Sequence, residues 1–495
     1  MALKPQESAE AIVREYGTPE TGRAEPKGEK KTMRSHEEQR QQPTSYEGSR
    51  QRVAVKPQGY AGVPSSLSAQ LDLSSREDQC DLLERMLEGN NLRLAYKRVK
   101  QNGGAPGVDN VTVDELQAHL WERWETVKKE LQEGTYRPMP VKRVEIPKPG
   151  GGIRLLGIPT VMDRFIQQAL MQAMTPIFDP LFSPNSYGFR PNKCAHDAVK
   201  QAQSYIQEGF RWVVDMDLEK FFDRVNHDIL MARVARKVSD KRVLKLVRAY
   251  LQAGVIADGI KLETIEGTPQ GGPLSPLLAN ILLDDLDKEL TARGLRFVRY
   301  ADDCNIFVRS RRAGERVMES VIRFVEGKIR LKVNRDKSAV DRPWNRKFLG
   351  FSFMRNKEAS IRIAPKKLEQ LKERVREITS RTRGISMDSR IKELNCYLMG
   401  WIGYFRLASA KKHCEALDEW IRRRLRMCLW KQWKLPKTRL RNLRALGVPE
   451  WAARIMANSR KGCWEMSRNI NNALNLSFWR DQGLLSLTSR YLAIR

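Results

Sequence analysis

The stretch Phe297-Val-Arg-Tyr-Ala-Asp-Asp-Cys-Asn-Ile-Phe-Val308 places two adjacent aspartates between two apolar runs. Runs rich in valine, isoleucine and aromatic residues favour β-strands, so we expect two strands joined by a short turn. Such a hairpin would hold Asp302 and Asp303 rigidly at its tip. Acidic pairs also occur in turns simply because turns are solvated, and a Tyr-x-Asp-Asp tetrapeptide alone does not separate the two interpretations.

A second acidic position follows another apolar run. Residues 210–217 predict a buried strand that ends at Asp217, and Leu-Glu-Lys-Phe-Phe-Asp223 comes next. Carboxylates brought together from neighbouring strands are the hard oxygen ligands that Mg²⁺ prefers. Two such ions about 3.5–4 Å apart can activate a 3′-hydroxyl and stabilise a departing pyrophosphate. Asp215 lies on the same face of the predicted strand as Asp217, because side chains alternate along a strand.

Two glycine-rich segments lie on either side of the strand that ends at Asp217. Gly267-Thr-Pro-Gln-Gly-Gly-Pro-Leu-Ser-Pro276 lets the backbone approach a base or sugar, with Gln270 as donor and acceptor. Ile146-Pro-Lys-Pro-Gly-Gly-Gly-Ile-Arg154 predicts a turn between strands that presents Lys148 and Arg154, two cations suited to a triphosphate. An ordinary strand-to-helix loop and a solvated basic hairpin are the alternatives.

In their order along the chain, these motifs resemble the reverse transcriptase family, specifically the group II intron-encoded reverse transcriptase/maturases and, among them, the bacterial class C proteins. The resemblance covers nearly everything from about Asp81 to Arg495. The matching segments are Gly103–Asp109, Tyr136–Pro159, Ser186-Tyr-Gly-Phe-Arg-Pro191, Asp217–Asp223, Thr268–Pro276, Tyr300–Asp303, Phe348-Leu-Gly-Phe351 and Trp401–Arg426.

The resemblance implies an α+β right-hand polymerase with fingers, palm and thumb and a basic helical C-terminal region. The expected divisions are a low-complexity, disordered tail over 1–75, an N-terminal extension and fingers over 76–205, a palm over 206–360, a thumb (maturase, or X) domain over 361–440, and a DNA-binding (D) domain over 441–495. No endonuclease domain and no structural zinc are expected, because the five histidines are isolated and the cysteines form no Cys-x-x-Cys pair.

The resemblance also implies roles for single residues. Asp217 and Asp302 would ligate both metals, and Asp303 would complete the acidic cluster. Asp217 is preferred to Asp215 because Phe222, five residues later, then takes the family's steric-gate position against a ribose 2′-hydroxyl. Core packing is the alternative for Phe222.

By the same matching, Lys148 and Arg154 would bind the dNTP triphosphate and Gln270 would lie beside the incoming nucleotide. Nucleic-acid contacts are expected from basic side chains of the fingers and the C-terminal helices. These are Lys142, Lys366, Lys367, Arg422, Arg423, Arg424 and Arg426.

The strongly positive charge of the chain favours a polyanionic partner. The 495 residues carry a net charge of +30. Residues 366–495 hold 29 Lys+Arg against 11 Asp+Glu, together with seven of the eleven tryptophans. A segment this basic would repel itself without a polyanion, although a solvated helical face is the plain alternative. The tryptophans at 401, 420, 430 and 433 are expected to anchor the core rather than stack on bases.

Other features limit the class of protein. No stretch approaches the roughly 18 apolar residues of a membrane span, and the start lacks an apolar signal region. The seven scattered cysteines favour a reduced compartment, so we expect a cytoplasmic bacterial protein associated with nucleoid or ribonucleoprotein. His227 and Cys304 are expected to be structural.

The expected activity is RNA-directed DNA synthesis with Mg²⁺ or Mn²⁺ and dNTPs, from a DNA or RNA primer on an RNA template. The protein would also bind its group II intron RNA, promote splicing, and extend a primer on target DNA during retrohoming. Two alternatives stay open: a reverse transcriptase of the same fold recruited for phage defence, CRISPR spacer acquisition or DNA repair, and a splicing cofactor with a vestigial polymerase.

Overall fold

The structure is a computed structural model that describes residues 81–147, 152–257, 260–262, 266–268 and 271–495. The tail predicted over 1–75 lies outside these residues. The chain divides into two compact units. The first contains the described residues up to Met174, most of 234–262, and 271–273, and the second contains the remainder.

The first unit combines helices with a four-stranded sheet. Its sheet has the order β2-β1-β4-β5, in which β1 and β2 form an antiparallel hairpin and β1 lies parallel to β4. The apolar residues of 81–100 and 113–131 have the spacing of amphipathic helices, and helices form there. The elements are α3 (Leu82–Leu87), α4 (Gly89–Asn102), α5 (Leu116–Glu133), β1 (Val141–Pro147), β2 (Ile153–Ile158), α6 (Val161–Phe178, which continues into the second unit), α9 (Lys241–Gln252), β4 (Val255–Ala257) and β5 (Ile260–Leu262).

The second unit is built on an antiparallel sheet of order β6-β7-β3-β8. The predicted hairpin is present as β6 (Arg296–Tyr300) and β7 (Asp303–Val308), and the predicted buried strand is β3 (Trp212–Met216). The remaining elements of this part are η1 (Asp179–Leu181), α7 (Ala195–Gln207), η2 (Phe221–Arg224), α8 (His227–Val234), α10 (Ser275–Ala292), α11 (Arg311–Phe324), η3 (Val325–Ile329) and β8 (Ala339–Asp341).

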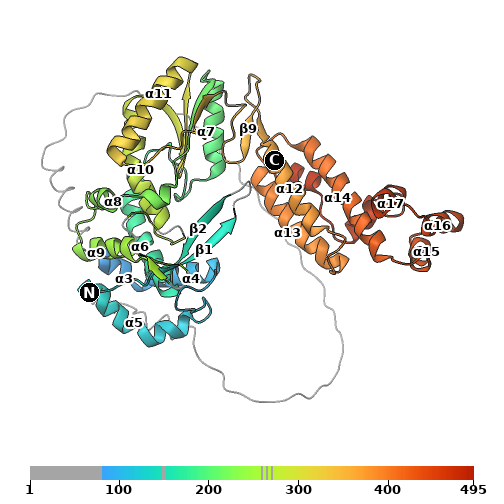
Figure 1. Ribbon diagram of the computed structural model, residues 1–495, viewed down its shortest axis with the longest axis horizontal. Helices are drawn as coiled ribbons and strands as arrows, with labels where there is room; N and C mark the ends of the chain where they lie inside the picture. The colour runs from blue at the N-terminus through green and yellow to red at the C-terminus, as the bar shows by residue number, and fades with distance from the viewer. Residues whose placement is uncertain (1–80, 148–151, 258–259, 263–265, 269–270) are drawn as a thin grey trace, which may run out of the picture. The chain divides into compact units, whose positions relative to one another are not determined.

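Helices cover this sheet, most of whose strand residues are buried (Figure 1). α11 packs on β3, β7 and β8, and α7 packs on β6 and β7. The approach of α11 is close at Gly314, where an added Cβ would lie 2.5 Å from Cγ1 of Val340. Glycine at this helix position therefore lets the helix backbone lie directly on the sheet.

One strand prediction was wrong in part. The largely apolar composition of the run Phe348–Phe353 predicts one strand, but only β9 (Phe351–Phe353) is extended, and it pairs with β10 (Ile361–Ile363) in a separate ribbon. Leu349 and Gly350 have φ values of 51° and 84°, so they form a tight turn closed by hydrogen bonds between Phe348 and Phe351. Apolar composition alone did not reveal this turn.

The basic C-terminal stretch is helical, as its spacing predicted. The four tryptophans expected to anchor the core do so: Trp430 is fully buried, and Trp401, Trp420 and Trp433 pack partly buried against the same apolar cluster. The helices are α12 (Pro365–Ile378), α13 (Met387–Phe405), α14 (Lys411–Gln432), α15 (Pro436–Ala445), α16 (Glu450–Ala457), α17 (Cys463–Asn469), α18 (Leu476–Asp481) and α19 (Leu487–Ala493). Within the described ranges, no helix combines the length and apolarity needed to cross a bilayer.

Gly314→Ala tests the close packing of α11. Alanine gains about 1 kcal/mol of helix propensity over glycine, but overpacking a rigid β-branched neighbour costs about 1–3 kcal/mol. We therefore expect a lower thermal unfolding midpoint for this variant. Gly400→Ala in α13 is the control, because nothing lies within 4 Å of an added Cβ there, and it should leave the midpoint unchanged or raise it. A midpoint for Gly314→Ala at or above that of the unsubstituted protein would contradict this packing.

Candidate active site

Strand register brings the predicted carboxylates to one face of the second unit's sheet. Met216 pairs with Cys304 and Asp215 with Asn305. Continued by one residue beyond the end of β3, this register would set Asp217 opposite Asp303, and directly opposed side chains share a face with Cβ atoms about 4.5–5.5 Å apart. The convergence of these carboxylates on a metal stays a prediction.

The turn that carries Asp302 has an unusual backbone. Tyr300 and Asp303 pair across the hairpin, leaving Ala301 and Asp302 as the turn. Ala301 is buried and has φ of 57°, a left-handed conformation that costs a non-glycine residue free energy. Gly188 packs against it so closely that an added Cβ would lie 2.4 Å from the Ala301 nitrogen.

The neighbouring carboxylates influence the pKa of Asp303. Desolvation by the surrounding protein is the largest cause, and together with the charges of Asp302, Asp215 and Asp217 it raises the pKa of Asp303 to about 7. Within the described residues, no three His, Cys, Asp or Glu side chains already form a metal-binding group. Mutually repelling carboxylates nonetheless fit a divalent cation, since its charge would offset their repulsion and carboxylate oxygens are its preferred ligands.

Two cations distinguish Asp217 from Asp215. Lys337, whose side chain is 69% exposed, lies with Nζ 3.3 Å from Oδ2 of Asp217. Arg346 instead holds Asp215 with Nε and Nη2 at 2.8 and 2.6 Å from the same oxygen, Oδ2. A contact from an exposed lysine is weak and easily displaced, so Asp217 can take up a metal more readily than Asp215.

Phe222 lies beside the start of the glycine-rich segment. Its carbonyl accepts a hydrogen bond from the Thr268 N–H at 2.7 Å, and an added Cβ at Gly267 would lie 2.9 Å from that carbonyl oxygen. Phe222 is partly buried and meets the buried ring of Phe221 edge-on at 5.0 Å. His227 is buried with Nε2 2.6 Å from the Gly267 carbonyl oxygen, as expected of a structural histidine.

The other predicted nucleotide- and nucleic-acid-binding residues lie in two segments. Lys142, Lys148 and Arg154 belong to the segment that contains β1 and β2, and Gln270 belongs to the glycine-rich segment. Arg154 is exposed on β2 and Lys142 is exposed on β1. Lys148 and Gln270 lie outside the described residues. Cys304 is buried in β7, and burial raises the pKa of its thiol well above the usual range, as expected for a structural cysteine.

The basic side chains of the C-terminal helices have different surroundings. Lys366 and Lys367 are exposed in the first turn of α12, and Arg422 is partly exposed on α14. Arg423 stacks on Trp464 with 3.9 Å from its guanidinium carbon to the ring centroid.

Two arginines of α14 are bound within the protein. Arg424 donates to Oγ1 of Thr379 at 2.6 Å. Arg426 is 6% exposed and donates to the Ser467 carbonyl at 2.7 Å, while burial lowers its pKa to about 10. These contacts show that Arg424 and Arg426 support helix packing, whatever else they do.

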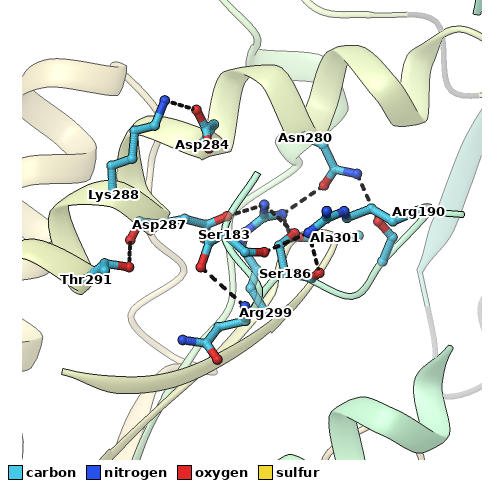
Figure 2. Close-up of polar contacts among 12 residues, drawn as sticks. Ser183, Ser186, Arg190, Asn280, Asp284, Asp287, Lys288, Thr291, Arg299 and Ala301 are labelled. Carbon is cyan, nitrogen blue, oxygen red and sulfur yellow. Dashed lines mark hydrogen bonds and ion pairs between the residues drawn. The ribbon is translucent and has the colours of Figure 1, made fainter. Parts of the chain in front are cut away.

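Sequence reasoning missed a buried polar network beneath the hairpin. It joins Arg299 of β6 to Asp287 and Asn280 of α10, to Ser186, and to the Ala301 carbonyl (Figure 2). The available signals were Arg299, the one charged residue of the apolar run Phe297–Tyr300, and the aspartates at 284, 285 and 287 in the largely apolar segment 277–290. Opposite charges in two buried elements are expected to pair.

The raised pKa of Asp303 gives a pH-dependent stability. An unfolded Asp303 loses its proton near the ordinary pKa of 3.8, whereas the folded one keeps it until about pH 7. The folded state then binds more protons, so this group's contribution to stability falls between about pH 4 and 7 and levels off above. In EDTA, Asp303→Asn should therefore raise the unfolding midpoint by a few degrees at pH 8 and less at pH 5.5. An identical midpoint difference at both pH values would contradict the raised pKa of Asp303.

Two family models match this chain. Residues 146–353 match the reverse transcriptase (RNA-dependent DNA polymerase) model, a span that contains β3, the hairpin and the glycine-rich segment. Residues 368–447 match the group II intron, maturase-specific domain, which corresponds to α12–α15.

Curated proteins show the same likeness. Protein YkfC of Escherichia coli (strain K12) is 35% identical over 273 residues, which are 48% of this chain and 72% of YkfC. The group II intron-encoded protein LtrA of Lactococcus lactis subsp. cremoris is 36% identical over 207 residues, 42% of this chain but 34% of LtrA. A chain of the solved "Partial Cas6-RT-Cas1--Cas2 complex" is 23% identical over 50% of this chain and 43% of that chain, with a TM-score of 0.33, too low to support a conclusion. With both family models in sequence order and most of YkfC matched, the chain belongs to the reverse transcriptase family, as a mixed α+β polymerase domain followed by a helical group II intron maturase domain.

Proposed function

We propose that this protein is an intron-encoded reverse transcriptase/maturase that copies RNA into DNA and binds group II intron RNA. The observation that supports the proposal is the pairing of β3 with β7, which ends at Met216 and Cys304, immediately before Asp217 and immediately after Asp303. The maturase-specific match implies intron RNA as a partner and extends the role from polymerisation to splicing. Target-primed retrohoming would follow when the protein extends a primer on cleaved target DNA.

The acidic face supplies the metal ligands in this proposal. Asp217 and Asp302 would each hold two Mg²⁺ or Mn²⁺ ions, and Asp303 would complete the cluster. When bound, the ions lower the pKa of the primer 3′-hydroxyl and neutralise the charge of the departing pyrophosphate. Lys337 would leave Asp217 as the cation enters, because both compete for the same carboxylate. The rigid hairpin would keep the carboxylates in place during the reaction.

The nucleotide pocket would use residues from both glycine-rich segments. Arg154, with Lys148, would bind the triphosphate, and Gln270 would lie beside the base or sugar. Phe222 would exclude a ribose 2′-hydroxyl. Its partial burial and its anchored carbonyl support this role, because a steric gate has to be held firmly while one ring edge stays accessible.

The proposal includes the right-hand division into an N-terminal extension with fingers (76–205), a palm (206–360), a thumb (361–440) and a D domain (441–495). The class C assignment is also part of this proposal. For the RNA-facing surface, exposure favours Lys142, Lys366, Lys367 and Arg422 over the two arginines that bind carbonyl groups within the helices.

A second candidate is the same polymerase recruited for phage defence, CRISPR spacer acquisition or DNA repair. The maturase-specific match favours the intron role. Sequencing the RNA that copurifies with the protein from its host separates them: a group II ribozyme supports the first, and unrelated transcripts support the second. A splicing cofactor with a vestigial polymerase is disfavoured because the acidic face is intact.

Asp302→Ala tests the metal ligands. We expect RNA-templated primer extension with dNTPs to fall by at least about 1,000-fold, since a metal ligand acts on the chemical step, while affinity for structured intron RNA stays within about twofold. Asp481→Ala, at the end of α18, removes the same charge far along the chain and should extend primers normally. Extension by Asp302→Ala at the rate of the unsubstituted protein would refute the assignment.

Phe222→Ala tests the steric gate. Removing the ring should raise the incorporation of rNTPs relative to dNTPs by about 10–200-fold, the range in which single-group changes shift selectivity in an enclosed pocket. The ratio is measured from kcat/KM for each nucleotide on one template. An unchanged ratio in a folded, active variant would assign Phe222 to core packing instead.

A further inference from the structure

The hairpin of the candidate site rests on a buried ion pair. The side chains of Arg299 and Asp287 are 1% and 0% exposed. Nε and Nη2 of Arg299 donate to the two carboxylate oxygens of Asp287 at 2.7 and 2.5 Å, a bidentate pairing (Figure 2). Burial acts to lower the pKa of Arg299, but the charge and hydrogen bonds of Asp287, together with the nearby Asp284, raise the pKa overall, so the guanidinium is held in its charged form.

The guanidinium uses every donor it has. Nη1 donates to Oδ1 of Asn280 at 3.0 Å and to the Ala301 carbonyl at 2.9 Å, and Nη2 also donates to Oγ of Ser186 at 2.8 Å. Arginine has five N–H donors in a fixed plane, and all five are matched here. A lysine ammonium could not reach partners on four sides from a single nitrogen.

One of these bonds reaches the turn itself. Ala301 precedes Asp302, and its carbonyl is held by Arg299 while its backbone is left-handed. On the other side of the turn, Asn280 donates through Nδ2 to the Gly188 carbonyl at 2.8 Å. The Gly188 backbone closes on the Ala301 nitrogen. Arg299 therefore fixes the turn directly, and through Asn280 it also fixes the segment packed against it.

Stability alone is a weak reason for such a pair. Burying two charges carries a desolvation cost that can exceed their attraction, and apolar residues of similar volume are often as stable. What apolar residues cannot supply is a directed bond to the Ala301 carbonyl. The arrangement makes sense if the orientation of the turn matters more than the energy of the core.

We propose that Arg299, held by Asp287, is a positioning residue that fixes the left-handed turn at Ala301 and thereby the places of the Asp302 and Asp303 carboxylates. This inference rests on the proposed polymerase function. Misplacing reacting groups by about 1 Å can lower a rate about 100-fold. A change at Arg299 is therefore expected to act on metal binding and on the chemical step, with little effect on the binding of nucleic acid.

The experiment compares three variants of the full chain. Arg299→Lys keeps the charge but loses the planar donors, and Ser186→Ala removes one acceptor. Leu290→Ala is the control. Leu290 is a buried apolar residue of the same helix as Asp287, so its truncation should destabilise the unit without removing a member of the network. The measurements are the unfolding midpoint, Mn²⁺ affinity by electron paramagnetic resonance without nucleic acid, primer–template affinity, and single-turnover extension over a range of Mg²⁺ concentrations.

For Arg299→Lys we expect Mn²⁺ binding weakened at least fivefold, maximal extension lowered about 10- to 100-fold, and primer–template affinity within twofold of the unsubstituted protein. Ser186→Ala should change the same quantities in the same direction by less. Leu290→Ala should lower the midpoint but keep Mn²⁺ affinity and rate at a temperature where it is folded.

Unchanged Mn²⁺ affinity and rate in folded Arg299→Lys would overturn the inference, as would equal losses in Leu290→Ala. If Arg299→Lys does not fold, Ser186→Ala decides on the same criteria. If the unsubstituted protein fails to extend any primer, the proposed function fails. The Mn²⁺ affinities then still decide whether Arg299 positions the turn.

Discussion

The bidentate pair between Arg299 and Asp287 is the interaction on which the candidate site depends. A two-metal site needs several carboxylates close together, and in the absence of cations these groups repel one another. That repulsion adds to desolvation, the larger cause, in raising the pKa of Asp303. The chain resists it by placing the carboxylates on a hairpin of an antiparallel sheet and by fixing the turn from beneath with a fully hydrogen-bonded guanidinium.

The two faces of the sheet carry ion pairs of different exposure. On one face, the contact between the exposed Lys337 and Asp217 is of the weak, solvent-screened kind, whereas Arg346 holds Asp215 with two short contacts. On the opposite face, Arg299 and Asp287 are sealed from water and cannot exchange partners cheaply. The net charge of +30 would attract a polyanionic partner, which the acidic face alone would repel.

Local pattern predicted the strands around the aspartates, the long helices and the structural histidine, because each depends on spacing within a short window. It did not predict the Arg299 network, whose members at 186, 280, 287 and 301 meet only through tertiary packing. For the same reason, local pattern did not distinguish Arg426, which is buried, from the other arginines of α14. Nothing in the sequence of so basic a helix indicates which arginine side chains are buried. The turn at Leu349 and Gly350 was missed because its residues are apolar on average.

The most direct test of the account is the position of the metals in crystals of the protein with an RNA template, a DNA primer ending in a dideoxynucleotide, a dNTP and Mn²⁺. Anomalous scattering locates the ions without reference to the protein model. We expect two anomalous peaks, both bridged by the carboxylates of Asp217 and Asp302, with each ion about 2.0–2.2 Å from its oxygen ligands. Ions bound elsewhere, or the carboxylates of Asp217 and Asp302 too far apart to share one, would contradict it.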